Sequence, residues 1–188
     1  MKEQLAPALQ ARWSPSTWDA SHELSEQELE LLLEAARWAP SAGNSQPWAF
    51  LPALRSTQNH ARILPFLAPS SAMWAPQASV LFLALRQISV QGSDLECSEF
   101  AQYDLGQAVA HLTIQAQSMG LHSRQFRAFN LDGLSAEFAV PAHWAITTMV
   151  AVGRLPADVL PHAARKPDGT LIPRDRMADI RFTSPFNR

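Results

Sequence analysis

The amino-acid sequence predicts an α+β fold in which helices cover a sheet in three α/β/α layers. Two long segments carry apolar residues at helical spacing, and two short, continuous apolar runs are typical of buried strands. No internal repeat, low-complexity tract or linker divides the chain, and 188 residues suit one compact domain covering residues 1–188.

The first long helix is predicted from Ser25 to about Trp38. Ser25 is a favourable N-cap, and Glu28 stands three residues later, as a capping box requires. Pro40 ends the helix, because the residue before a proline is disfavoured in the helical region. Residues 1–11 are expected to form a short helix or a loose arm.

The next segments alternate between strand and helix. Residues 48–54 are predicted to form a strand and residues 55–67 a short helix. Residues 78–85 form a continuous apolar run, which indicates a central strand buried on both faces. Residues 146–155 form a second such run. Residues 87–97, which follow the first run, are predicted to form a polar loop.

The longest helix is predicted over residues 99–119, with Gly120 as its C-terminal stop. A strand over residues 121–126 and a short helix over residues 134–138, ended by Pro141, should follow. From residue 156 onward the chain is rich in proline and charge, which predicts an extended tail.

Composition excludes several classes of function. The net charge of −2 gives no basic surface for nucleic acid and no polybasic membrane patch. Cys97 is the only cysteine, so no intrachain disulfide forms, which fits a cytoplasmic location. The first ten residues lack a signal-peptide apolar region, and no apolar stretch reaches the length of a membrane span, so no membrane association is expected.

Several well-known site motifs are absent. The seven glycines lie too far apart for a Rossmann dinucleotide motif or a P-loop. There is no G-x-S-x-G nucleophile elbow. The six histidines form no H-x-x-x-H pair, and one cysteine cannot build a zinc cluster, so no metal site is expected.

The most informative stretch is residues 35–48, which read AARWAPSAGNSQPW. It resembles the A-P-S-(S/A)-x-N-x-Q-P-W segment of the nitroreductase family. Serine and asparagine supply compact donors and acceptors for the edge of a flavin ring. The resemblance implies that the ring is contacted by Pro40, Ser41, Ala42 and Asn44. The alternative is an ordinary helix–loop–strand connection with capping polar residues.

A second match covers residues 12–18, which read RWSPSTW. It is similar to the family's R-x-S-x-R-x-(F/Y) element, whose arginines and serine hold the phosphate of FMN. Arg12 and Ser14 fit that role, because a guanidinium makes bidentate, charge-assisted bonds to phosphate. Ser16 stands where the family usually has a second arginine, so the phosphate is neutralised less here. The alternative is that Arg12 is a solvated surface residue.

Two further matches concern the long helix and the strand that follows it. Residues 104–121 resemble the family's D-x-G-x-A…L…A…G-L helix, which implies packing at a dimer interface and no chemistry. Residues 125–130 correspond to a segment ending in G-G-F-D, whose backbone amides reach flavin N5; the residues implied are Gln125, Arg127 and Ala128. Arg127 replaces glycine, and it either places a cation near the substrate face or points into solvent.

The last match is residues 173–180, PRDRMADI, which are similar to a C-terminal tail that returns to the phosphate. Arg174 is the first choice for that contact and Arg176 the second, and either would supply the positive charge that Ser16 lacks. The family commonly has a lysine before the central strand, whereas residues 71–74 read SAMW.

The resemblance implies an intertwined homodimer with two FMN molecules at its interface. It also implies ping-pong chemistry, in which NADH or NADPH delivers hydride to the flavin and a small-molecule acceptor such as a nitroaromatic or quinone is then reduced. No side chain is singled out as catalytic, so positioning and flavin electronics would carry the reaction. Two alternatives remain: a non-catalytic flavin-binding protein for storage or sensing, and a family member with other redox chemistry, such as dehalogenation, flavin-ring cleavage or dehydrogenation.

Overall fold

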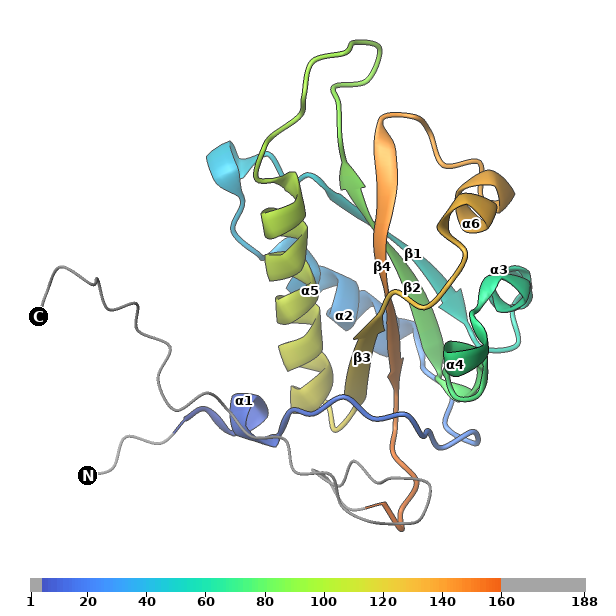
Figure 1. Ribbon diagram of the computed structural model, residues 1–188. Helices are drawn as coiled ribbons and strands as arrows, with labels where there is room; N and C mark the ends of the chain where they lie inside the picture. Colours follow the sequence, from blue (N-terminus) through green and yellow to red (C-terminus); the bar gives the residue numbers. More distant parts are fainter. Residues whose placement is uncertain (1–4, 160–188) are drawn as a thin grey trace, which may run out of the picture.

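The computed structural model describes residues 5–159, which form a four-stranded antiparallel sheet with helices on both faces (Figure 1). The strand order is β1-β2-β4-β3, so β2 and β4 lie inside this sheet. The strands are β1 (Trp48–Leu54), β2 (Val80–Gln87), β3 (His122–Phe126) and β4 (Trp144–Gly153).

The two inner strands are the two apolar runs of the sequence. The first five residues of β2 and the last five of β4 are all buried, and the two strands pair from Val80↔Val152 onward. Both faces of these segments exclude water, which explains why their apolar residues run on without alternating with polar ones. The predicted central strand is confirmed, although it begins at Val80, two residues later than expected.

Helices cover the sheet on both sides, which confirms the three-layer prediction. One face carries α2 (Glu26–Arg37) and α5 (Ala101–Ser118), with α1 (Pro7–Ala11) against α5. The other face carries α3 (Gln58–Ile63), α4 (Pro69–Ala72) and α6 (Leu131–Glu137). Three short 3-10 turns connect the elements: η1 (Ala42–Asn44), η2 (Leu64–Phe66) and η3 (Ala75–Gln77). No helix within residues 5–159 is both long and apolar enough to cross a bilayer.

Capping side chains decide where the helices begin. The Ser25 capping box is present: its hydroxyl accepts from the Glu28 N–H (3.3 Å), and the Glu28 carboxylate accepts from the Ser25 N–H (2.8 Å). Helix α6 begins three residues earlier than predicted, because the Asn130 side chain accepts from the Gly133 N–H (3.0 Å). Helix α3 begins after the predicted residue 55, because Ser56 has a φ of +67° and Thr57 is the N-cap.

Two buried histidines lie near Arg55. The Ser79 hydroxyl donates to the His22 carbonyl (2.9 Å), so the His22 Nδ1–H donates to the Ser79 oxygen at the same distance. Burial lowers the pKa of His22, and the charge of Arg154 lowers it further. Burial also lowers the pKa of His60, helped by the charge of Arg55. Both rings are therefore held in their neutral form.

Candidate flavin site

The residues singled out by sequence lie in two groups near opposite ends of α5. The first group is the loop Pro40–Gln46, which lies beside the first turn of α5. The second group, which we call the arginine cluster, comprises Arg12, Ser14 and Arg124, and it lies beside β3. Figure 1 shows η1 of the loop at one end of α5, and the segment that follows α1 toward the other end.

The loop Pro40–Gln46 folds into a tight, left-handed path. Gly43, Asn44 and Gln46 have φ values of +58°, +55° and +48°. Left-handed backbone is costly for residues other than glycine and asparagine, and tertiary structure must hold it in place. The Ser41 hydroxyl accepts from the Gln46 N–H (3.0 Å), and the Gln46 side-chain amide donates to Asn44 Oδ1 (3.2 Å). These bonds hold the loop in one shape.

Asp104 anchors this loop to α5. Its side chain is buried, with Oδ2 accepting from the Ala42 N–H (3.0 Å) and Oδ1 from the Gln107 amide (3.3 Å). The Gln107 amide also lies 3.4 Å from the Pro40 carbonyl. A buried carboxylate requires such donors. The family resemblance implied only a packing role for this helix, and the spacing of Asp104 and Gln107 on one helical face was the signal for the anchor.

The loop leaves few polar groups for a ligand. The N–H groups of Ala42, Asn44, Ser45 and Gln46 all donate within residues 5–159. The Ser41 hydroxyl hydrogen and the Asn44 Nδ2 group make no hydrogen bond to another described residue. Ser41 is half-buried and Asn44 exposed, so both can be reached from outside.

The arginine cluster is built from the N-terminal segment and β3. Arg12 Nη1 lies 3.3 Å from the Ser14 hydroxyl, and Arg124 Nη1 lies 3.2 Å from the Ser14 carbonyl oxygen. Both arginines are half-buried, whereas Ser14 and Ser16 are exposed. Sequence reasoning missed Arg124, and its only signal was a charged residue within a short strand.

The segment after β3 carries the remaining predicted residues. The Gln125 amide donates to the Thr113 hydroxyl of α5 (3.1 Å), which turns this side chain toward α5. The Ala128 carbonyl accepts from the Ala68 N–H (3.0 Å) and from the Ser71 hydroxyl. Arg127 is exposed. Arg127 and Ala128 come directly after β3, the strand that holds Arg124.

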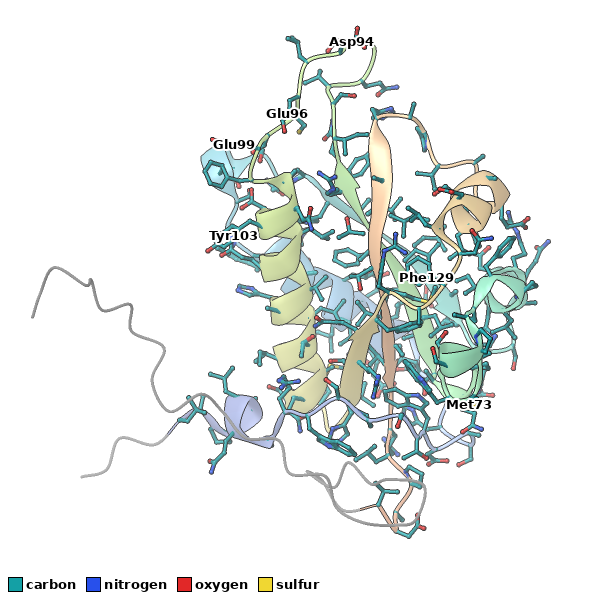
Figure 2. All side chains as sticks on the ribbon, in the orientation of Figure 1. Met73, Asp94, Glu96, Glu99, Tyr103 and Phe129 are labelled. Atoms are coloured by element: carbon teal, nitrogen blue, oxygen red, sulfur yellow. The ribbon has the colours of Figure 1, made fainter. Side chains whose placement is uncertain are left out.

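A row of aromatic rings supports this segment. Trp74 and Phe126 meet edge-on with ring centroids 4.8 Å apart, and Phe126 and Phe129 do so at 6.1 Å. The Arg124 guanidinium lies 4.8 Å from the Trp74 ring centroid, and that of Arg127 lies 4.6 Å from the Phe129 centroid. Each end of the aromatic row therefore carries a stacked guanidinium. Figure 2 labels Phe129 in this region, with Met73 beside the neighbouring helix α4.

The structure does not bring the two groups together within one chain. The helix rises about 1.5 Å per residue, so Asp104 and Ser118 lie about 21 Å apart along α5. One group meets the first turn of this helix, and the other meets the strand that follows its last turn. Arg174 and Arg176 lie outside the described residues.

Comparisons with known proteins agree with this architecture. The chain matches the model of the nitroreductase family over residues 9–83, a stretch that includes Arg12, Ser14 and the loop Pro40–Gln46. It is 29% identical over 176 residues to Protein DrgA of Synechocystis sp. (strain ATCC 27184 / PCC 6803 / Kazusa), covering 80% of this chain and 84% of that protein.

Solved structures share the fold over most of its length. An oxidoreductase containing FMN has a TM-score of 0.83 and 27% identity, covering 99% of this chain and 94% of its own. A nitroreductase family protein from Clostridium difficile 630 has a TM-score of 0.68 and 19% identity, covering 88% and 91%. The fold is thus nitroreductase-like, and the chain resembles the nitroreductase family in both its sequence and its structure.

Proposed function

We propose that this protein binds FMN as a homodimer and transfers reducing equivalents from NADH or NADPH to a nitroaromatic, quinone or related acceptor. The observation that carries the proposal is the pair of complementary groups near opposite ends of α5. One group is cationic and suits a phosphate, and the other is neutral and suits a ring edge. The FMN content of the oxidoreductase at 27% identity supports the same cofactor here.

The donor chemistry of the two groups fits FMN. Arg12 and Ser14 offer a guanidinium and a hydroxyl to the phosphate, which carries nearly two negative charges at neutral pH. The Ser41 hydroxyl and the Asn44 amide would hold the carbonyl and imide edge of the flavin ring. We expect Pro40 to line the ring through van der Waals contact.

The other predicted residues take secondary places in this proposal. Ala42 and Gln125 would line the site without donating, because the Ala42 N–H and the Gln125 amide already donate to other groups. The backbone at Arg127 and Ala128 would lie near N5, and Ser16 would add a hydroxyl near the phosphate. Arg174 remains our first choice for a further phosphate contact, and Arg176 the second.

The chain's residues would position the cofactor and exclude water from it. When bound, FMN would supply the two-electron chemistry between the nicotinamide and the acceptor. No described side chain is proposed to move a proton, so catalysis would come from orientation and from the charges around the ring.

The outer surface of α1, α2 and α5 supports a dimer. Four large apolar side chains with exposed fractions between 44% and 73% lie on these helices: Leu9, Leu31, Trp38 and Tyr103. A groove of about 580 Å³ runs between α1, α2 and α5. Figure 2 shows Tyr103 projecting from α5 on the side away from the sheet. Exposed apolar patches of this kind mark interaction sites.

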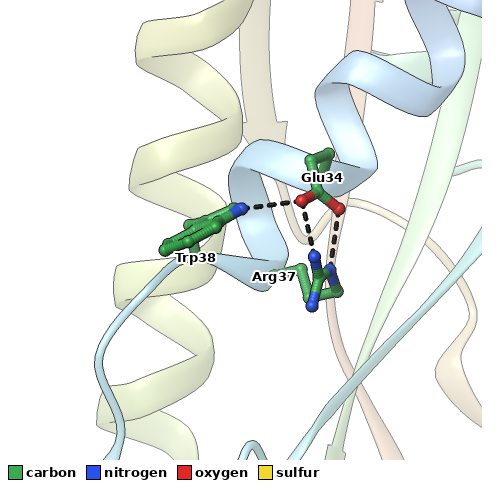
Figure 3. Close-up of polar contacts among 3 residues, drawn as sticks. All are labelled: Glu34, Arg37 and Trp38. Atoms are coloured by element: carbon green, nitrogen blue, oxygen red, sulfur yellow. Dashed lines mark hydrogen bonds and ion pairs between the residues drawn. The ribbon is translucent and has the colours of Figure 1, made fainter.

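Trp38 is fixed in place on this surface before any partner binds. Its indole N–H donates to Glu34 Oε1 (2.7 Å), and Arg37 bonds both oxygens of the same carboxylate (Figure 3). These bonds, first from Arg37 and then from Trp38, lower the pKa of Glu34 to about 2. An aromatic anchor with a fixed orientation loses little entropy when a second copy packs on it.

A second copy is the partner that fits these observations. In a two-fold dimer that packs α5 antiparallel against its partner's α5, the loop of one chain meets the arginine cluster of the other. One FMN would then touch both chains, and each dimer would hold two.

The experiment is an FMN titration of the purified protein, followed by anaerobic addition of NADH or NADPH. We expect about one FMN per chain and a rise in melting temperature with FMN concentration. Bleaching of the flavin absorbance by either nucleotide, and its return on adding a quinone, would support the oxidoreductase. Flavin that binds but never bleaches would favour the storage or sensing alternative, and failure to bind FMN would overturn the proposal.

A further inference from the structure

The turn that follows β3 offers a backbone N–H group to a ligand. The Phe129 N–H donates to the Arg127 carbonyl (2.9 Å), which closes a γ-turn centred on Ala128. The Ala128 carbonyl accepts from the Ala68 N–H (3.0 Å) and from the Ser71 hydroxyl. The Ala128 N–H, in contrast, donates to no group within the described part of the chain, although this residue is half-buried. A half-buried peptide donor without an acceptor is costly, so a ligand that accepts from it gains free energy.

Ser71 holds this turn from the neighbouring helix α4. Its side chain is fully buried, and its hydroxyl is directed at the carbonyl oxygens of Ala128 and Ala68, the latter at 3.0 Å. The same two segments are joined again where the Asn130 N–H donates to the Phe66 carbonyl (2.8 Å). The γ-turn fixes φ of Ala128, and the two donors on its carbonyl fix the peptide that follows. The N–H of Ala128 therefore has one direction, set in part by Ser71.

We propose that Ser71 is a positioning residue, which keeps the Ala128 N–H directed at flavin N5 and thereby lowers the reduction potential of bound FMN. The inference rests on the proposed FMN binding and adds a buried residue that acts only through Ala128. N5 of oxidised flavin has a lone pair and accepts a hydrogen bond, whereas N5 of reduced flavin carries a hydrogen of its own. A firmly held N–H therefore favours the oxidised form, and a potential falls when the oxidised form is bound more tightly.

The geometry of the turn also allows the N–H itself to be removed. Ala128 has a negative φ, so the γ-turn is of the inverse type, with a central φ close to the value that proline imposes. Proline at position 128 lacks an N–H but keeps the carbonyl that Ser71 holds. Ala128→Pro therefore deletes the proposed contact to the flavin, and Ser71→Ala only loosens it. If Ser71 acts through this N–H, its substitution has no further effect once the N–H is gone.

The test measures the dissociation constant of oxidised FMN by flavin fluorescence and the midpoint potential of bound FMN against a reference dye, using the full-length protein. Ser71→Ala removes the hydroxyl but leaves the Ala68 N–H on the same carbonyl, and Ser71→Thr keeps a hydroxyl. Two variants serve as matched controls. Ser70→Ala alters the exposed neighbour in α4, and Ser79→Ala removes a buried hydroxyl that donates to another backbone carbonyl, that of His22 (2.9 Å).

We expect Ser71→Ala to weaken the binding of oxidised FMN about three- to tenfold, the value of one neutral hydrogen bond, and to leave reduced FMN almost unaffected. At about 29.6 mV per tenfold for a two-electron couple, the midpoint potential should rise by about 15–30 mV. Ser71→Thr, Ser70→Ala and Ser79→Ala should keep the potential of the unaltered protein. Ala128→Pro should raise the potential at least as much as Ser71→Ala, and the double variant should match Ala128→Pro.

An unchanged potential in Ser71→Ala, whether or not both forms of FMN bind more weakly, would show that Ser71 serves only the fold and would overturn the inference. An unchanged potential in Ala128→Pro, or a further rise in the double variant, would overturn it as well. If Ser71→Ala does not fold, Ser71→Cys takes its place with the same expected direction, because a thiol fills the same space and donates weakly. An unaltered protein that binds no FMN would instead overturn the proposed function, so the two failures are distinguishable.

Discussion

Replacing Arg127 with glycine should change which electron acceptors the protein reduces while leaving FMN bound. Arg127 is exposed, and its guanidinium is stacked on Phe129 at 4.6 Å, beside the segment proposed to face flavin N5. The proposed FMN contact at this position is made by backbone, which survives the substitution. The lost charge would no longer attract an acceptor that carries a carboxylate.

The size of the effect follows from Coulomb's law. At a separation of about 7 Å, two unit charges interact by about 0.6 kcal/mol at the dielectric constant of water and about 2.4 kcal/mol at an effective value of about 20. An exposed guanidinium lies between these limits, so we predict a selectivity change of about 1–2 kcal/mol, or about five- to thirtyfold. At an ionic strength of about 1 M the screening length falls to about 3 Å, and most of the effect should vanish.

The assay is kcat/KM for a matched pair of neutral and carboxylate-bearing nitrobenzenes at low and high salt. Arg127→Gly and Arg127→Gln should both favour the neutral member, and Arg127→Lys should behave like the unaltered protein. An unchanged ratio at low salt would refute the reasoning and indicate that Arg127 points into solvent. Release of flavin from Arg127→Gln would show that the side chain itself holds the cofactor.

The remaining predictions concern the loop, the buried histidines and the dimer. Asp104→Ala should destabilise the protein by about 1–3 kcal/mol, because it leaves the Ala42 N–H without its buried acceptor, and it should also weaken FMN binding. Asp104→Asn should have a smaller effect on both stability and FMN binding. An unchanged melting temperature in Asp104→Ala would contradict the role of Asp104 as an anchor. His22 and His60 have lowered pKa values in the folded protein, so their contribution to the free energy of unfolding is fully present above about pH 6.5 and is lost as the pH falls below that value. A variant with both histidines replaced by asparagine should lose this pH dependence in thermal melts, and a dependence that persists would assign it to other groups. Trp38→Ala should raise the dimer dissociation constant measured by sedimentation about thirtyfold, as expected of an anchor worth about 2 kcal/mol, whereas Leu95→Ala on the exposed loop after β2 should leave it unchanged. Equal dissociation constants for the two variants would show that Trp38 does not lie in the interface.

Local chemistry made much of the fold predictable. The Ser25–Glu28 capping box and the break at Pro40 bracket α2, and the continuous apolar runs locate β2 and β4 to within two residues. The start of α6 was harder, because residues 131–133 carry no strong helical repeat and only the Asn130 cap marks the beginning. Boundaries set by one side chain's hydrogen bond are easily missed in sequence.

The site residues that sequence reasoning missed act over long sequence separations. Asp104 bonds the backbone of Ala42 across 62 residues, and Arg124 meets Ser14 across 110. No spacing rule links such pairs, because they meet only once the sheet and α5 have packed. The motif residues Arg12, Ser14, Ser41 and Asn44 could be named from sequence because each lies within a short contiguous segment. Their binding roles remain predictions.

The distance along α5 has a genetic consequence under the proposed dimer. Each chain would give its loop to one flavin and its arginines to the other, so no cofactor depends on both groups of the same polypeptide. A subunit defective only in Ser41 and Asn44, paired with one defective only in Arg12, would form one pocket with both defects and one pocket with neither. Two alleles that are each inactive alone would then complement each other when expressed together, with one working site in every mixed pair.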